Sequence, residues 1–166
     1  MALKIMTYDG STGRGEWEAF VNQHPDGSVF QMPWMYEAWQ HTRKQRTIVY
    51  FARDEGRLAG VMMVVKLWNG IFPVSALSKR QLIIGGPLVE NNDLGILLAL
   101  LEALIKHTGK NAVFTSIHNL RMGLSLKPVF EEAGFYYESH LSIVLDVSRG
   151  AESLWEPLGS GRKDNI

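Results

Sequence analysis

Residues 82–93 constrain the fold more than any other part of the sequence, because they join a strand pattern to a sharp turn and a helix start. The apolar run 82–84 is typical of a buried strand, and a double glycine ends it. Asn92 or Asp93 can cap the helix that follows. Glycines let backbone N–H groups approach a ligand closely, and a helix N-terminus attracts anions. We therefore expect substrate binding at Gly85, Gly86, Pro87 and Leu88.

The composition limits the classes of protein to which this chain can belong. A chain of 166 residues that is 46% hydrophobic can bury one ordinary core, so one domain is expected. Seventeen Lys and Arg residues balance seventeen Asp and Glu residues, so overall charge draws the chain neither to DNA nor to an anionic membrane. The absence of cysteine excludes disulfides and cysteine nucleophiles and suits a cytoplasmic location. No apolar run predicts a signal peptide or a membrane span.

Hydrophobic periodicity predicts alternating strands and helices. A turn at residues 54–57 joins two strands into a hairpin. The longest helix ends at Gly109 and is expected to bury Leu97, Leu101, Leu104, Ile105 and Thr108. The predicted strands are 3–8, 47–53, 58–67, 79–85, 112–117 and 137–147, and the other helices begin near residue 16, at residue 33 and at residue 127.

This order of elements resembles the acyltransferase superfamily called GNAT. The resemblance implies an α+β fold with a mixed central sheet flanked by helices. It also implies two strands that splay apart between Gly85 and Ser116, with the donor's pyrophosphate at the N-terminus of the long helix. Ser116 and Asn119 would line the second wall of that substrate cleft. The superfamily's usual phosphate loop, a basic residue followed by alternating glycines, is missing here.

Three segments carry a more specific resemblance, to the Fem-type aminoacyltransferases that build peptidoglycan bridges. They are residues 17–31, the Gly85–Leu88 turn and residues 134–141. Each motif is weak alone, but their order and spacing together resemble that group. The resemblance implies transfer of an acyl or aminoacyl group to an amine, on a small molecule or a cell-wall precursor. It implies no permanently bound cofactor and an activated donor, either aminoacyl-tRNA or acyl-CoA.

Fem-type proteins typically carry two acyltransferase-like halves. The resemblance assigns residues 1–148 to the N-terminal half and residues 149–166 to the linker or helix that leads to a second half. Such a half is expected to be inactive alone, and a homodimer is another source of the missing half. A non-catalytic module that recognises a cell-wall precursor or a partner chain is the alternative function.

His118 is the candidate catalytic residue, because amine attack on an ester or thioester needs a base with a pKa near neutrality. The simpler interpretation is a strand-end histidine bonded to a loop. Tyr36 is the aromatic residue of its helix expected to face solvent and substrate. The five histidines form no ligand motif, so no metal site is predicted. Arg43, Lys44 and Arg46 form a basic cluster that suits either phosphate contacts or a solvated helix end.

Overall fold

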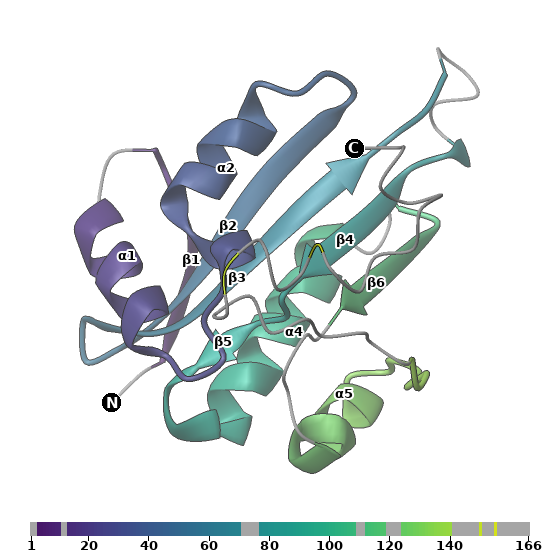
Figure 1. Cartoon of the computed structure of the whole chain (residues 1–166). Helices are drawn as coiled ribbons and strands as arrows, with labels where there is room; N and C mark the ends of the chain where they lie inside the picture. Colours follow the sequence, from purple (N-terminus) through teal and green to yellow (C-terminus); the bar gives the residue numbers. More distant parts are fainter. Residues whose placement is uncertain are drawn as a thin grey trace.

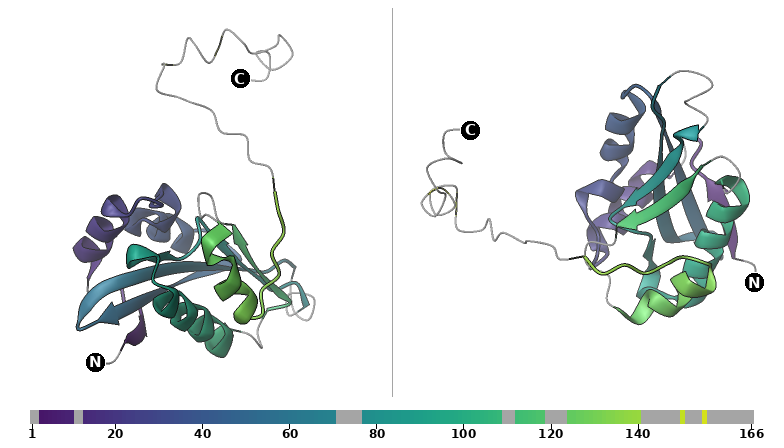
Figure 2. Two further views of the ribbon diagram at one scale, coloured as in Figure 1. Left: turned by 90° about the horizontal axis from the view of Figure 1, so that it is seen from below. Right: turned by 90° about the vertical axis from the view of Figure 1, so that its right-hand side faces the viewer.

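In the computed structural model, a mixed sheet separates two layers of helices (Figure 1). The structure describes residues 3–10, 13–70, 77–108, 112–118 and 124–140, with Gly150 and Trp155. The strand order is β1-β2-β3-β4-β6, and β5 pairs with β3. Figure 2 shows α1 and α2 on one face of the sheet and α4 on the other. The expected α+β architecture with a mixed sheet is confirmed.

The elements follow the predicted order. The strands are β1 (Lys4–Thr7), β2 (Gln45–Asp54), β3 (Arg57–Leu67), β4 (Arg80–Ile84), β5 (Leu88–Val89) and β6 (Phe114–His118). The helices are α1 (Arg14–Gln23), α2 (Pro33–Gln40), α4 (Leu94–Thr108) and α5 (Lys127–Glu132), with the 3₁₀ turns η1 (Val29–Gln31), η2 (Glu90–Asn92) and η3 (Leu124–Leu126). The sequence did not predict β5 or the 3₁₀ turns, because two or three residues show no periodicity.

Hairpin and crossover pairings build the sheet. β2 pairs with β1 and with β3, and β3 pairs with β4, all in an antiparallel manner. β4 pairs with β6 in parallel. Glu55 and Gly56 both have positive φ angles, 51° and 83°, in the turn between β2 and β3. Two positive φ angles match the right-handed twist of a tight hairpin, which confirms the predicted turn.

Each face of the sheet has its own apolar core. α4 and α5 cover one core, where Leu97, Leu100, Leu101 and Leu104 are at most 1% exposed. These positions follow the i, i+3, i+4, i+7 spacing of one helix face. Ile105 is 45% exposed, so its predicted burial is wrong, and Leu100 takes that place in the core. Nothing is described for the side chain of Thr108.

The last predicted strand is only partly described. The described part, residues 137–140, has no strand pairing, and residues 141–147 lie outside the described residues, as does Gly109. Only Gly150 and Trp155 are described in the segment 149–166. The division of the chain at residue 148 stays a prediction.

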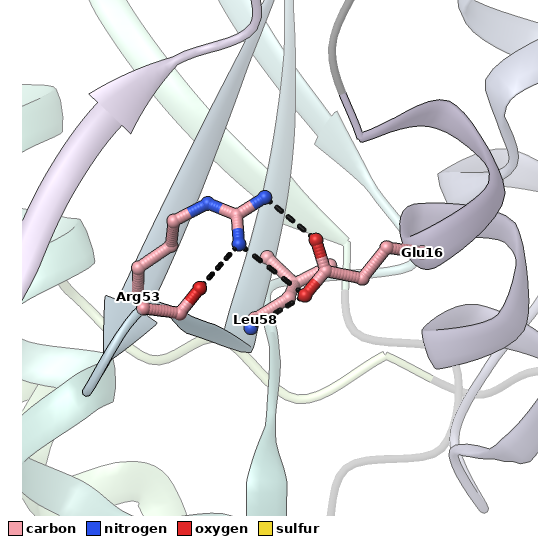
Figure 3. Close-up of polar contacts among 4 residues, drawn as sticks. Glu16, Arg53 and Leu58 are labelled. Carbon is pink, nitrogen blue, oxygen red and sulfur yellow. Dashed lines mark hydrogen bonds and ion pairs between the residues drawn. The ribbon is translucent and has the colours of Figure 1, made fainter.

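A carboxylate ties α1 to the β2–β3 hairpin (Figure 3). Glu16 accepts hydrogen bonds from both terminal nitrogens of Arg53, at 2.6 and 3.2 Å, and from the backbone N–H of Leu58, at 2.9 Å. Arg53 also donates to the carbonyl of Gly56 at 2.7 Å. The Arg53 hydrogen bond lowers the pKa of Glu16 from its ordinary value of 4.5, and the Leu58 hydrogen bond adds to this. The first helix is therefore held to the sheet by a charge-assisted contact.

This contact predicts a measurable sensitivity to acid. Because the Glu16 pKa is depressed in the folded state, its stabilisation is present above pH 4.5 and is lost as the pH falls through the lower folded pKa. Chemical unfolding of the wild type should therefore show an extra loss of stability in this window that Glu16→Gln lacks. The difference should stay below about 1 kcal/mol, because solvent screens a partly exposed pair.

Glu18→Gln is the matched control, since Glu18 is exposed on the same helix. If Glu16→Gln and Glu18→Gln follow the same pH profile of unfolding free energy, the proposed tie contributes nothing.

Candidate active site

β4 and β6 run in parallel and end at the same level. Their register pairs Leu82 with Ser116 and Ile84 with His118, and the Gly85 N–H donates to the His118 carbonyl at 2.9 Å. The expected splay at Ser116 is therefore wrong, since Ser116 lies inside a continuous ladder. Asn119, the other residue predicted on this wall, lies outside the described residues.

A bulge interrupts the pairing of β3 where its partner passes from β4 to β5. Val65 of β3 pairs with Leu82, and Val61 of β3 pairs with Leu88. The two pairs are four residues apart along β3 but six residues apart along the partner segment. Two extra residues must bulge out of the ladder, and the double glycine provides them. Gly85 and Gly86 have φ angles of 87° and 75°, which side chains rarely adopt. The predicted glycine turn is confirmed, and it lies directly beside the end of β6.

Ser116 and His118 form a side-chain pair on one face of β6. The His118 Nε2 lies 2.8 Å from the Ser116 Oγ, within hydrogen-bonding distance. Ile83 and Ile117 pack into the core under α4, so the alternate residues Ser116 and His118 project from the opposite face of the sheet. The His118 side chain is exposed and that of Ser116 is half-buried. The His118 imidazole is thus exposed at the end of the parallel pair.

Gln31 holds the glycine turn in place from the other side. Its Nε2 donates to the carbonyls of Gly85 and Gly86, at 2.7 and 3.2 Å. Its Oε1 accepts from the N–H and the Oγ of Ser28, at 2.9 and 2.6 Å. Gln31 is 0% exposed, and the Trp17 Nε1 donates to its backbone carbonyl at 2.7 Å. Gln31 therefore joins η1 to the glycine turn through its buried carboxamide and to α1 through its backbone carbonyl.

His24 makes a second tie between the same parts of the chain. Its Nδ1 accepts from the Asp26 N–H at 3.1 Å, which leaves the proton on Nε2. The Nε2 then donates to the carbonyl of Val89 at 3.0 Å. The segments that carry the Fem-type resemblance, 17–31 and Gly85–Leu88, are thus packed together by structural hydrogen bonds.

The turn offers fewer oxyanion donors than its sequence suggests. Gly85, Gly86, Pro87 and Leu88 are all buried. The Gly85 N–H is bonded to His118, proline has no N–H, and Leu88 pairs with β3. Among the described hydrogen bonds, the Gly86 N–H has no acceptor.

The N-terminus of α4 carries its own anion. The Asp93 Oδ1 accepts from the N–H groups of Gly95 and Ile96, at 2.8 and 3.0 Å. Of the two predicted capping residues, Asp93 is the cap. A phosphate at this helix end would have to displace the carboxylate or lie beside a like charge. The sequence showed the capping residue but not this consequence for a phosphorylated donor.

Tyr36 has a different environment from the one expected. Its ring is half-buried and lies edge-on to Tyr8 and Trp17, at centroid distances of 5.4 and 6.0 Å. The exposed aromatic residue of α2 is instead Trp34, which is 43% exposed. Tyr36 thus completes the core under α1 and α2, and its expected exposure is wrong.

The described residues contain neither a metal-binding cluster nor a helix that could cross a membrane. No group of three or more histidine, aspartate or glutamate side chains in them has a metal-binding arrangement. None of the helices in the described part combines the length and apolar character needed to cross a membrane.

Comparison with known proteins bears on the fold. No protein-family model and no curated protein sequence matches this chain. Solved structures do match. A ribosomal-protein-alanine N-acetyltransferase from Brucella melitensis biovar Abortus 2308 is 14% identical, with a TM-score of 0.59 over 87% of this chain and 100% of that one.

Two further structures agree. Glucosamine-6-phosphate N-acetyltransferase from Arabidopsis thaliana is 16% identical, with a TM-score of 0.62 over 88% of this chain and 100% of that one. The aminoglycoside acetyltransferase AAC(6')-Iy, in complex with a CoA-containing bisubstrate analogue, is 13% identical, with a TM-score of 0.63 over 88% of this chain and 99% of that one. Such likenesses show the GNAT-like fold, and this prediction is confirmed.

The Gln31 contact predicts an unusual cost of substitution at Gly85. A Cβ at Gly85 would lie 2.6 Å from the Gln31 Nε2, whereas one at Gly134, with a similar φ of 82°, meets nothing within 4 Å. Each alanine should cost about 1–2 kcal/mol for its left-handed backbone, and Gly85→Ala should lose clearly more unfolding free energy in denaturant titrations. Equal losses in the two variants would show that Gln31 does not press on the turn.

Proposed function

We propose that this chain is the N-terminal half of a Fem-type transferase that moves an aminoacyl group onto an amine of a cell-wall precursor. The observation that carries the proposal is the Ser116–His118 pair, which lies where β4 and β6 end, beside the Gly85–Gly86 turn. The fold supports the reaction class, since the three similar structures are named as N-acetyltransferases, which acylate amines.

His118 supplies the base in this proposal. The amine nitrogen attacks the carbonyl carbon of the donor ester, the imidazole accepts the amine proton, and the ester C–O bond breaks as the C–N bond forms. The proton then goes to the departing oxygen. Ser116 is a positioning residue, because its hydroxyl orients the His118 ring. The Gly86 N–H donates to the developing oxyanion.

The donor is an aminoacyl ester, as in aminoacyl-tRNA, rather than acyl-CoA. Two features support this choice. The sequence lacks the glycine-rich phosphate loop, and the Asp93 carboxylate already binds the N–H groups at the start of α4. An ester of an RNA 3' end needs no diphosphate at that helix.

A second function, a non-catalytic binding module, has one observation in its favour. The residues Gly85–Leu88 are buried, and Gln31 holds the two glycine carbonyls. A turn fixed in this way suits recognition of a precursor or a partner chain as well as it suits catalysis. Saturable precursor binding without any product would favour this module over the transferase.

The transferase proposal predicts a specific effect of His118. Transfer of labelled alanine from alanyl-tRNA to a peptide with a free lysine amine is measured for this chain. The full-length protein is assayed in the same way if the reading frame continues past Ile166. His118→Asn should lower the rate by about 100-fold or more, the usual contribution of a general base. Ser116→Ala should lower it less and alter its pH profile.

His41→Asn provides the control, since His41 is exposed at the end of α2. The proposal fails if His118→Asn and His41→Asn retain equal activity. Transfer from acetyl-CoA but not from alanyl-tRNA would contradict the proposed donor.

A further inference from the structure

A cavity lies where β4 begins, at the opposite end of the strand from the glycine turn. It has a volume of about 490 Å³ and is lined by the end of β3, the start of β2 and the start of β4. Four of its lining residues are cations, Arg46, Lys66, Lys79 and Arg80, and the remainder are Leu67, Trp68 and Gln81. No acidic residue lines it among the described residues.

The strand register brings three of these cations, Arg46, Lys66 and Lys79, to one face of the sheet, whereas Arg80, next to Gln81 in β4, alternates to the other face. Arg46 on β2 pairs directly with Lys66 on β3, and Lys66 pairs with Gln81 on β4. Paired residues point to the same face of a sheet, so Arg46 and Lys66 are neighbours, and Lys79, two residues before Gln81, lies on that face too. Like charges placed directly opposite each other destabilise a sheet. This arrangement costs stability in the free protein.

Nothing described nearby neutralises the four cations. None of them forms an ion pair with a described carboxylate. In the sequence, the stretches 71–76 and 109–111, which precede the paired strands β4 and β6, contain no Asp or Glu. Burial, followed by the charges of Arg46 and Lys79, lowers the pKa of Lys66. In a chain whose net charge is zero, this is a concentrated positive site.

We propose that the Arg46–Lys66–Lys79–Arg80 cavity binds the diphosphate group of a ligand. Phosphate oxygens accept strong hydrogen bonds from lysine and arginine. A single phosphate group carries about −1.5 to −2 charges, fewer than the three positive charges that share this face, so a diphosphate matches them better. A bound diphosphate would remove the repulsion between Arg46 and Lys66, and the energy stored in that repulsion would favour binding.

This site is separate from the proposed catalytic residues. Arg80 begins β4, whereas Gly85 and the level of His118 lie at its end, a strand length away. The inference therefore does not rest on acyl transfer, and either proposal can fail without the other.

The test measures binding of inorganic pyrophosphate to the whole chain by isothermal titration calorimetry in phosphate-free buffer. Orthophosphate and a ten-nucleotide oligouridylate are compared with it. We expect saturable binding of pyrophosphate at one site, weaker binding of orthophosphate, and a loss of affinity at higher salt. Lys66→Gln should weaken pyrophosphate binding at least about tenfold, as expected for loss of one charged hydrogen bond.

Lys4→Gln is the matched control, because Lys4 is exposed on β1 at the far edge of the sheet. Thermal unfolding gives a second readout that does not depend on calorimetry. Without ligand, Lys66→Gln should melt at or above the wild-type temperature, since a repelled cation is removed. Pyrophosphate should raise the melting temperature of the wild type and of Lys4→Gln by more than that of Lys66→Gln.

Three outcomes would overturn the proposal. One is the absence of saturable pyrophosphate binding, and another is an equal loss of affinity in Lys66→Gln and Lys4→Gln. The third is binding of oligouridylate without binding of pyrophosphate, which would make this surface a contact for a nucleic-acid backbone.

Discussion

The buried carboxamide of Gln31 is the interaction on which the rest of the site depends. It bonds to both glycine carbonyls at the end of β4, while Trp17 and Ser28 fix Gln31 itself. A buried donor without an acceptor costs about 1–3 kcal/mol, so the turn and the Gln31 side chain must keep one geometry together. The Gly85 N–H donates to the His118 carbonyl, so the turn also fixes the backbone at His118, the last residue of β6.

The surroundings of β4 are positively charged where the strand begins and carry a carboxylate beyond the point where it ends. At its end, the Asp93 carboxylate occupies the α4 N-terminus, and the protein disfavours a second anion there. At its beginning, Arg46, Lys66 and their neighbours favour an anion. A phosphorylated ligand is therefore expected at the beginning of β4 and an uncharged carbonyl at its end.

The sequence predicted the strands and helices because their periods of 2 and 3.6 residues are local signals. It also predicted the glycine turn, and it named Asp93 as one of two possible helix caps. It placed Ile105 in the core, because the helical stripe is broad and a sequence does not show where the sheet lies beneath it. The contact of Gln31 with Gly85 spans 54 residues and left no local signal. The cationic cavity was missed for the same reason, since Arg46, Lys66 and Lys79 meet only through strand register.

The most direct test of the central claim is a nuclear magnetic resonance titration of the ¹⁵N-labelled chain with a stable, amide-linked analogue of an aminoacylated RNA 3' end. The histidine ring resonances are assigned with His118→Asn. The account predicts that the His118 ring and the Gly86 amide shift together and saturably, while His41 and His140 do not move. Saturable shifts that leave both His118 and Gly86 unchanged would contradict a reaction site at the end of β4 and β6.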